Sequence, residues 1–449
     1  MRRSLSLCVV LAGLSVLVVR PAPSYDPWAW LLWGGEVLDG RLDTVAGPAF
    51  KPLPVAVCTL LATLGSAAPW AWVLLARAAA AVALWLVFRL GRRLAGGSLL
   101  AGALAVGAAA LCGPFLDQAA AGLSEPMLVA LALAGAEAAR VGRPRWALAC
   151  AVGVALLRVE SWPFLVVLGL VAWRRRPGDR PLLVVAAALV PLAWFLPELV
   201  GSGDLLRSAS RAQVPNPGQP ALADVPALAS LREAVALPLW PLWVGVGVLA
   251  WLAGAEGDSW ARRALVPAAV GAAWALLVAV MAQAGFSGEP RYAVPGAALV
   301  AVSGAVGLVL GVAHVAGRPG APALAVSALL AVLAVAGEPR VGALSEMRRS
   351  QAYQWALQAD LAAAVQAAGG TEEVLECGQP YVGPLRGPLM AYRLEVAKHQ
   401  VEPDLAPRAP GVVFRSAIHV GASPAPAVPS GFEPVAHVGT WEVFARCWP

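Results

Sequence analysis

Residues 25–30, YDPWAW, lie a few positions beyond the first apolar segment of the chain, and KPLP at residues 51–54 opens a later one. Asp26 in this stretch therefore stands close to the end of a hydrophobic helix. A carboxylate at this depth lies at the boundary between lipid and water, where it can meet a lipid-borne substrate without burial in hydrocarbon. The stretch predicts a membrane protein that carries out chemistry at the membrane surface.

The composition of the 449-residue chain supports a polytopic membrane protein. Hydrophobic residues make up 59% of the chain, charged residues make up only 13%, and the mean hydropathy is +0.70. A soluble globule of this composition would have too little polar surface to cover its core. The net charge of +6 does not indicate a nucleic-acid partner, because most arginines stand in short clusters between apolar runs.

About eleven apolar segments have the length and composition of membrane-spanning helices. They fall at residues 5–19, 70–90, 99–112, 127–139, 146–157, 162–173, 182–199, 238–253, 265–284, 292–315 and 321–336. The first segment also resembles a cleaved signal peptide. However, RPAP at residues 20–23 is a poor small-residue cleavage site, which favours an uncleaved anchor.

The arginines between these segments predict the orientation of the chain. Following the alternation of the spans, they fall on one side, which the positive-inside rule assigns to the cytoplasm. The clusters are Arg2/Arg3, Arg92/Arg93, Arg140/Arg143/Arg145, Arg174/Arg175/Arg176/Arg180, Arg262/Arg263 and Arg318. Loops on the opposite side carry mixed charge. We therefore expect an integral plasma-membrane protein with a cytoplasmic N-terminus and an extracytoplasmic C-terminal segment.

Two domains follow from these patterns. Residues 1–337 are expected to form the transmembrane domain, with a first exported loop at residues 21–69. Residues 338–449 are expected to form a small exported α/β domain, because apolar runs shorten there and charges return.

Within the C-terminal domain, residue patterns predict a helix over residues 345–368 and three strands, at 374–377, 412–414 and 441–444. Cys377 and Cys447 are its only cysteines. In an oxidising compartment they fit a disulfide, and they fit two separate buried thiols equally well.

The first exported loop is rich in acidic residues and tryptophans. It contains Asp26, Glu36, Asp39, Asp43, Lys51, Trp28, Trp30 and Trp33. The apolar spacing over residues 28–38 fits a helix lying in the membrane interface, with the tryptophan rings as anchors at headgroup level. Asp26 directly before Pro27 is a usual helix start, and the roles of N-cap and catalytic base are compatible there.

The order of several short motifs resembles that in the GT-C glycosyltransferases, which include the lipid A aminoarabinose transferases and the protein O-mannosyltransferases. That superfamily has an acidic residue after the first span and a Pro-Pro-Leu type motif later in the first exported loop. Asp26 and KPLP stand at these places, although Pro27 replaces a second acid. The later motifs are GRRL at 91–94, LSEP at 123–126, LRVE at 157–160 and EPRY at 289–292.

The resemblance implies a GT-C-like transferase that moves a sugar from a polyprenyl-phosphate donor to a glycan, lipid or protein acceptor on the outer face. Asp26 is the expected general base, with a pKa raised by partial desolvation, and Asp43 is the second catalytic candidate. Direct action of Asp26 as base inverts the sugar carbon. The exported-side cations expected to bind the leaving phosphate are Lys51, Arg158 and Arg291.

Glu125, Glu160 and Tyr292 complete the candidate substrate-binding residues. Arg158 and Glu160 lie between two apolar segments of about twelve residues each, so their turn should lie below the outer surface. At that depth they either pair with each other or bind substrate. Glu125 stands near a predicted helix start, where a cap or first-turn acid is a better interpretation than a metal ligand.

Other chemistries find little support in the sequence. The four histidines, 314, 399, 419 and 437, lack zinc-ligand spacing, and no nucleotide-binding loop or Gly-x-Ser-x-Gly elbow occurs in its required setting. No cofactor is required by these patterns, and a divalent metal has no support. The alternative function is a transporter or lipid flippase, which predicts matching halves and ionisable groups near the midplane. The charges here gather on one side, which favours the enzyme.

Overall fold

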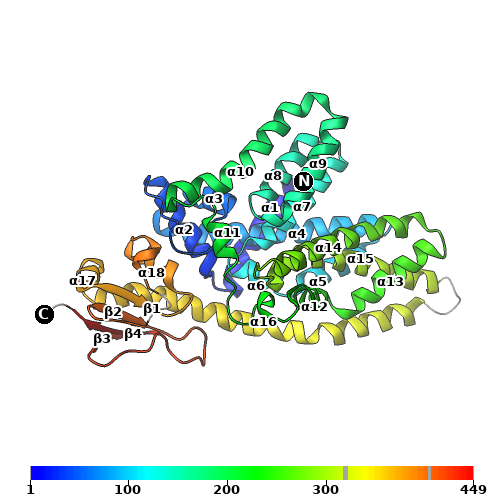
Figure 1. Cartoon of the computed structure of the whole chain (residues 1–449). Coiled ribbons are helices and arrows are strands. Elements are labelled where there is room, and N and C mark those ends of the chain that lie inside the picture. The colour runs from blue at the N-terminus through cyan, green and yellow to red at the C-terminus, as the bar shows by residue number, and fades with distance from the viewer. Residues whose placement is uncertain (1, 317–321, 403–405, 448–449) are drawn as a thin grey trace.

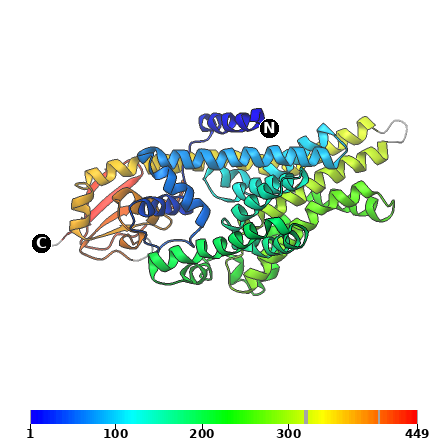
Figure 2. The same cartoon turned by 90° about the horizontal axis from the view of Figure 1, so that it is seen from above.

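The computed structural model describes residues 2–316, 322–402 and 406–447. Figures 1 and 2 show an elongated helical region with a small sheet at one end, next to the C-terminus. Arg318 and Ala321, which belong to the predicted arginine clusters and the last predicted span, lie outside the described residues. The architecture confirms the prediction of a helical polytopic membrane fold with a small C-terminal sheet.

The predicted apolar segments coincide with helices. The helices before the C-terminal domain are α1 (Arg2–Val18), α2 (Tyr25–Leu38), α3 (Pro52–Ala62), α4 (Ala68–Leu94), α5 (Leu99–Ala110), α6 (Phe115–Ala120), α7 (Glu125–Arg140), α8 (Pro144–Ala155), α9 (Trp162–Arg175), α10 (Arg180–Ser202), α11 (Arg207–Ala212), α12 (Pro226–Ala236), α13 (Trp240–Gly254), α14 (Ser259–Gln283), α15 (Pro290–Ala316) and α16 (Pro322–Ala367). Several begin with proline in the first turn, where its missing N–H costs no hydrogen bond.

Four stretches of the described chain are each long and apolar enough to cross a membrane as one straight helix. They are Gly65–Leu94, Pro177–Ser202, Ser259–Gln283 and Pro290–Val315. A fifth span is possible if α12 and α13, which are bent by 91° at their junction, cross together. The other predicted spans are shorter, so the total number of passes stays a prediction.

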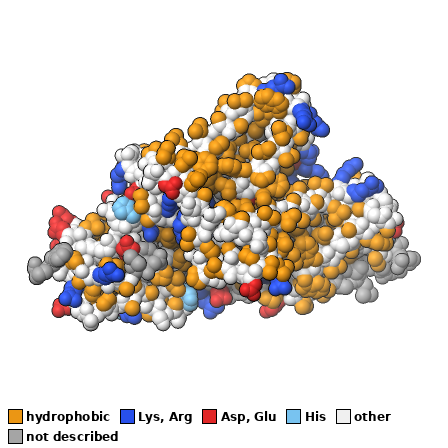
Figure 3. All heavy atoms as spheres, viewed as in Figure 1, with side chains coloured by type: hydrophobic (Ala, Val, Ile, Leu, Met, Phe, Trp, Pro, Cys, Tyr) orange, Lys and Arg blue, Asp and Glu red, His pale blue; other side chains and the backbone are white. Residues whose placement is uncertain are grey.

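The surface of the helical region is apolar, as contact with lipid requires. Figure 3 shows hydrophobic side chains over much of the visible face, with Lys and Arg gathered at helix ends far from the C-terminal domain. On α9, Val166, Val167, Leu168 and Leu170 are each more than half exposed. Such an apolar surface suits a bilayer and would be unfavourable in water.

Small residues allow the central helices to pack closely. A side chain at Gly271 of α14 would collide with the backbone of Gly296 on α15, and one at Gly245 of α13 would collide with Gly304. Close backbone contact of this kind is typical of helices that associate in membranes, where hydrophobic burial gives little driving force. The packing holds α15, and with it Arg291 at its first turn, in a fixed position.

The tryptophans of α2 do not face lipid as anchors, contrary to the prediction. Trp30 and Trp33 are fully buried, and Trp30 meets Trp72 edge to face at 5.5 Å between ring centroids. Trp28 packs against Tyr392 of the C-terminal domain at 5.1 Å. The prediction was wrong because the apolar spacing identifies a buried face, and the burial is supplied by α3, α4 and the C-terminal domain instead of lipid.

The helical region continues without a break into the C-terminal domain through α16. The sequence predicted two elements, at 321–336 and 345–368, but Pro339 is accommodated inside one helix. Nearby, Arg340 Nη2 donates a hydrogen bond to the carbonyl of Ala236 at 2.9 Å. As a result, the expected boundary between residues 337 and 338 falls within a continuous helix.

The C-terminal domain contains a four-stranded sheet with strand order β1-β2-β4-β3. The elements are α17 (Thr371–Cys377), β1 (Gln379–Val382), α18 (Gly387–Leu394), β2 (Gly411–Arg415), β3 (Glu433–Val438) and β4 (Trp441–Arg446). β1 and β2 are parallel and the other pairs are antiparallel. Trp441 and Phe414 are fully buried between this sheet and α16, and the Trp441 indole donates to the Leu357 carbonyl.

Two of the three predicted strands are confirmed, as parts of β2 and β4. The segment 374–377 is the end of helix α17 instead, because Glu372 and Glu373 favour the first turn of a helix that starts after Gly370. Cys377 and Cys447 form a disulfide, which settles the choice that the sequence left open. The strands β1 and β3 were not predicted.

Candidate functional site

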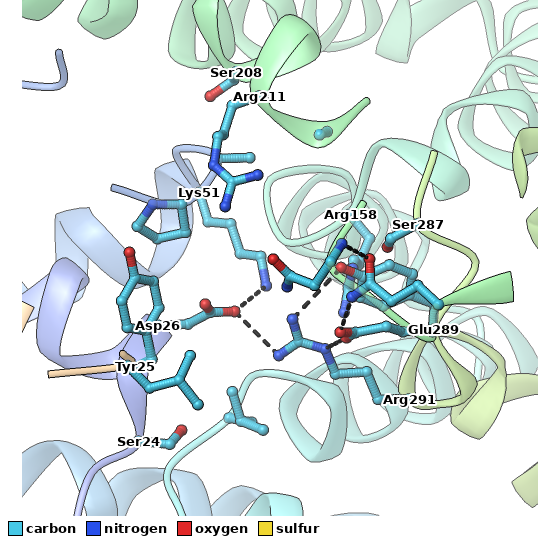
Figure 4. Close-up of a pocket in the computed structure, with 18 of the residues that line it drawn as sticks. Ser24, Tyr25, Asp26, Lys51, Arg158, Ser208, Arg211, Ser287, Glu289 and Arg291 are labelled. Atoms are coloured by element: carbon cyan, nitrogen blue, oxygen red, sulfur yellow. Dashed lines mark hydrogen bonds and ion pairs between the residues drawn. The ribbon is translucent and has the colours of Figure 1, made fainter. Parts of the chain in front are cut away.

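A cavity of about 1040 Å³ lies where the helical region meets the C-terminal domain. Its walls come from the start of α2, the start of α3, the turn between α8 and α9, α11, the start of α15, α16 and the loop after β1. Figure 4 shows Asp26, Lys51 and Arg291 pointing toward one another in this cavity. These three residues were predicted from separate motifs, and the structure brings them together.

Asp26 is held between two cations. It is the second residue of α2, and Ser24 occupies the N-cap position without a capping hydrogen bond from its side chain. The Asp26 carboxylate accepts a hydrogen bond from Arg291 Nη1 at 3.2 Å, and Lys51 Nζ is 3.8 Å away. Asp26 is therefore not the N-cap, and its side chain is directed to the cavity.

The pKa of Asp26 is lowered, although its position in the sequence predicted a raised one. Burial disfavours the carboxylate and by itself raises the pKa, since only 8% of Asp26 is exposed. The positive charges of Arg291, Lys51 and Arg158 outweigh this effect. The side chain is thus ionised and able to accept a proton, but its basicity is restrained while these cations face it.

Lys51 stands at the N-cap of α3, immediately before Pro52. Its ammonium lies 4.9 Å from the centre of the Trp30 ring and 3.5 Å from Ser124 Oγ. Burial, together with the charge of Arg158, lowers the pKa of Lys51 to about 8, although Asp26 and Glu125 act in the opposite direction. Lys51 is therefore a cation whose charge depends on its surroundings.

The loop that leads to Lys51 is fixed by α11. Arg207 donates to the carbonyl oxygens of Gly47 and Pro48, at 2.8 and 2.6 Å. Ser208 Oγ accepts a hydrogen bond from the Phe50 amide at 2.6 Å. Glu198 of α10 is fully buried and pairs with Arg207. These contacts fix the backbone before Lys51 and so place its side chain at the cavity.

Arg158 makes the predicted contact with Glu160 and a second one with Glu125, and it lines the cavity. It pairs with Glu125, the first residue of α7, and its Nη1 is 3.6 Å from Glu160. The guanidinium also lies over the Tyr292 ring, 3.9 Å from its centre. Two carboxylates thus balance the charge of Arg158. Glu125 is a first-turn acid of α7, as predicted, and also a buried ion-pair partner.

Arg291 is likewise balanced by carboxylates. Besides Asp26 it pairs with Glu289, which also accepts a hydrogen bond from Gln219. Its guanidinium lies 5.2 Å from the centre of the Tyr292 ring. Because Arg291 contacts both Asp26 and Glu289, these two acids neutralise much of its charge. Its main effect in the cavity is to hold the carboxylate of Asp26 in place.

Arg211 is a further cation of the cavity that was not predicted from the sequence. Figure 4 shows this side chain extending from α11 toward the same part of the cavity as Lys51. Its Nη1 donates to the Val214 carbonyl at 2.9 Å, and within the described chain it forms no ion pair with an acid. The signal for it was present, because Arg207 and Arg211 are four residues apart in an expected exported loop and so lie on one helix face.

Asp43 lies apart from this group. Its Oδ2 is 3.0 Å from His399 Nδ1 in the C-terminal domain, and it is not among the residues that line the cavity. Its backbone amide donates to Glu36, whose pKa burial raises to about 7. Among the residues that the structure describes, no group of three or more His, Cys, Asp or Glu side chains is arranged to hold a metal ion.

Solved structures resemble the whole chain. The crystal structure of the aminoarabinose transferase ArnT from Cupriavidus metallidurans bound to undecaprenyl phosphate matches with a TM-score of 0.56 and 15% identity, over 98% of this chain and 96% of that one. The apo state of ArnT gives the same TM-score and identity, over 98% and 97%. The chain has the GT-C fold.

The GT-C fold confirms the resemblance inferred from the order of the sequence motifs. The likeness lies in the structure, since no protein-family model and no curated protein matches the sequence. In this chain the start of α2, the start of α3 and the start of α15 converge on one cavity, which is where Asp26, Lys51 and Arg291 lie.

Proposed function

We propose that this protein transfers a sugar from a polyprenyl-phosphate donor to an acceptor on the outer face of the membrane, with Asp26 as general base. The observation that carries the proposal is the placement of Asp26 between Lys51 and Arg291 in a large cavity. The GT-C fold supports it, as does the undecaprenyl phosphate bound to the structurally similar ArnT.

The donor phosphate is expected to bind between Lys51 and Arg211. Both are cations that line the cavity, and Arg211 has no carboxylate partner in the described chain. Among the described residues, Lys51 lies 3.8 Å from a single acid, Asp26, whereas Arg158 and Arg291 each pair with two acids at shorter distances. An anionic leaving group gains most from cations whose charge is not already neutralised.

Binding of the phosphate also prepares the base. Once Lys51 faces a phosphate, it attracts the Asp26 carboxylate less, and the pKa of Asp26 rises toward the range of an effective base. Asp26 then accepts the proton of an acceptor hydroxyl as its oxygen bonds to the sugar carbon. The bond from that carbon to the phosphate oxygen breaks, and polyprenyl phosphate leaves with the electron pair. Because no covalent enzyme intermediate forms, the sugar carbon is inverted.

The test is the Asp26→Asn variant, whose amide keeps the shape of the side chain but cannot act as a base. Sugar transfer should fall about 10²- to 10⁴-fold. Undecaprenyl phosphate binding by the same variant should remain measurable, which shows that the protein is folded. Near-normal turnover by a folded Asp26→Asn protein would refute Asp26 as the general base. Lipid translocation without sugar transfer by the wild-type protein would instead favour the flippase alternative.

A further inference from the structure

One wall of the cavity belongs to the C-terminal domain and is built on α16. Gln351, Gln354 and Gln358 all line the cavity, and their spacing of three and four residues places them on one face of the helix. Leu385 and Arg386, from the loop between β1 and α18, lie beside them. We call these five residues the glutamine wall.

Two of the glutamines already form hydrogen bonds within the protein. Gln354 Oε1 accepts a hydrogen bond from Arg386 at 3.2 Å, and its Nε2 donates to the Ile418 carbonyl at 3.0 Å. Gln358 Nε2 donates to the Pro23 carbonyl at 2.9 Å. Pro23 is three residues before Asp26, so the glutamine wall is attached to the segment that carries the base.

Gln351 has an unfilled hydrogen-bonding atom. The residue is only 8% exposed, and its Oε1 is buried without a partner in the described chain. Trp28, also 8% exposed and lining the cavity, has an indole N–H without a partner. An unpaired buried polar atom costs about 1–3 kcal/mol, which a ligand can recover by supplying the missing partner. One acceptor and one donor suit hydroxyl groups, which both donate and accept.

The glutamine wall carries one positive charge, which belongs to a deeply buried arginine, and no acid. The lining residues from the C-terminal domain include no acid, and the single cation among them is Arg386. Its Nη1 and Nη2 are occupied by Gln354 and by the carbonyls of Ala417 and Ile418. Arg386 is only 6% exposed, so a second phosphate would have to displace these hydrogen bonds to reach it, whereas within the described chain Arg211 uses only Nη1 in a hydrogen bond.

The wall also lacks the features that bind extended peptides. Such peptides commonly add to an open strand edge. Here the edge of β1 is covered, because the Val382 amide donates to the Glu402 carbonyl and the Glu402 amide donates to the Pro380 carbonyl, each at 3.1 Å. Leu385 holds an unusual left-handed backbone conformation, with φ of 62°, and half of its side chain is exposed at the cavity. Strained residues of this kind cluster at functional sites.

We propose that the glutamine wall is the acceptor subsite and that the acceptor is a neutral, hydroxyl-rich glycan. The inference rests on the proposed transferase function. The Gln351 amide and the Trp28 indole N–H hydrogen-bond the sugar hydroxyls, and Leu385 contacts an apolar sugar face. The hydrogen bond between Gln358 and Pro23 keeps this subsite next to Asp26.

The experiment measures two ligands separately, using the full-length protein in lipid nanodiscs. Saturation-transfer-difference NMR reports binding of mannotetraose, maltotetraose and arabinotetraose, with a Ser/Thr-rich peptide and a phosphorylated disaccharide as competitors. Undecaprenyl phosphate binding is measured in the same preparation. Gln351→Leu, which removes the amide at nearly constant volume, is compared with Gln366→Leu on the exposed face of the same helix.

At least one tetrasaccharide should bind the wild-type protein, and Gln351→Leu should weaken it about tenfold while undecaprenyl phosphate affinity stays within about twofold. Gln366→Leu should bind both ligands normally. If Gln351→Leu does not fold, Trp28→Phe, which removes the indole N–H and replaces the indole with a smaller aromatic ring, should show the same loss. The proposal is overturned if no tetrasaccharide binds, if both variants bind normally, or if the peptide or the phosphorylated sugar takes the site. Tetrasaccharide binding without undecaprenyl phosphate binding would count against the donor assignment alone.

Discussion

The affinity of the protein for undecaprenyl phosphate should fall as the pH rises through about 8, because Lys51 must be protonated to bind the phosphate. Lys51 is 8% exposed, and its nearest acid, Asp26, is 3.8 Å away and shared with Arg291. One shared carboxylate does not offset burial and the nearby charge of Arg158, so the pKa falls to about 8 from the usual value above 10.

The size of the effect follows from this pKa. Lys51 is about 90% protonated at pH 7 and about 10% protonated at pH 9. If only the protonated form binds, the dissociation constant rises about tenfold between these two pH values. A bound phosphate favours the ammonium form and therefore raises the pKa of Lys51. Binding above about pH 8 thus takes up a proton, so the affinity must fall, and not rise, as the pH increases.

The assay is a binding titration of undecaprenyl phosphate to the protein in nanodiscs between about pH 7 and about pH 9.5, a range in which a phosphate with a second pKa of about 6 is already ionised. Lys51→Gln should bind weakly at every pH, and Lys51→Arg should show no decline, because a guanidinium stays protonated. Arg41→Gln, at an exposed position of the same loop, should keep the wild-type profile. A level wild-type affinity, or a decline retained in Lys51→Arg, would refute the reasoning.

Other parts of the structure give predictions of the same kind. Arg211→Gln should weaken undecaprenyl phosphate binding about ten- to a hundredfold, which is the effect of losing one hydrogen bond to a charged group. The control is Arg232→Gln, at an exposed position of α12, which should bind normally. Equal losses in the two variants would contradict a contact between Arg211 and the phosphate. In intact cells, a cysteine beside Arg175 should be protected from an impermeant thiol reagent and one beside Asn216 should react, whereas reversed labelling would overturn the predicted orientation. Cys377→Ser removes a disulfide between residues 70 positions apart and should lower the free energy of unfolding of the C-terminal domain by about 4 kcal/mol, so an unchanged melting temperature would argue against that estimate.

The sequence by itself determined the class of the protein and most of its helices. Long apolar segments leave a chain no alternative to helices in a membrane, because every backbone hydrogen bond must be made internally. Asp26, Lys51 and Arg291 were also identified from local motifs, since each charged residue stands next to an apolar segment at a recognisable place. Local patterns sufficed because they report on burial and on helix ends.

Tertiary structure alone decided how these residues meet. Asp26 and Arg291 are 265 residues apart, and their contact depends on how α2 and α15 pack. The pKa of Asp26 was expected to rise from burial and is lowered instead, since the nearby cations come from other elements. Trp30 was expected at the lipid surface and is buried under neighbouring helices. Gln351 was not predicted as a site residue, because a single amide in a polar helix gives no local signal. Periodicity shows which face of a helix is buried, but the surface that covers it, and the charges that surface carries, belong to distant parts of the chain.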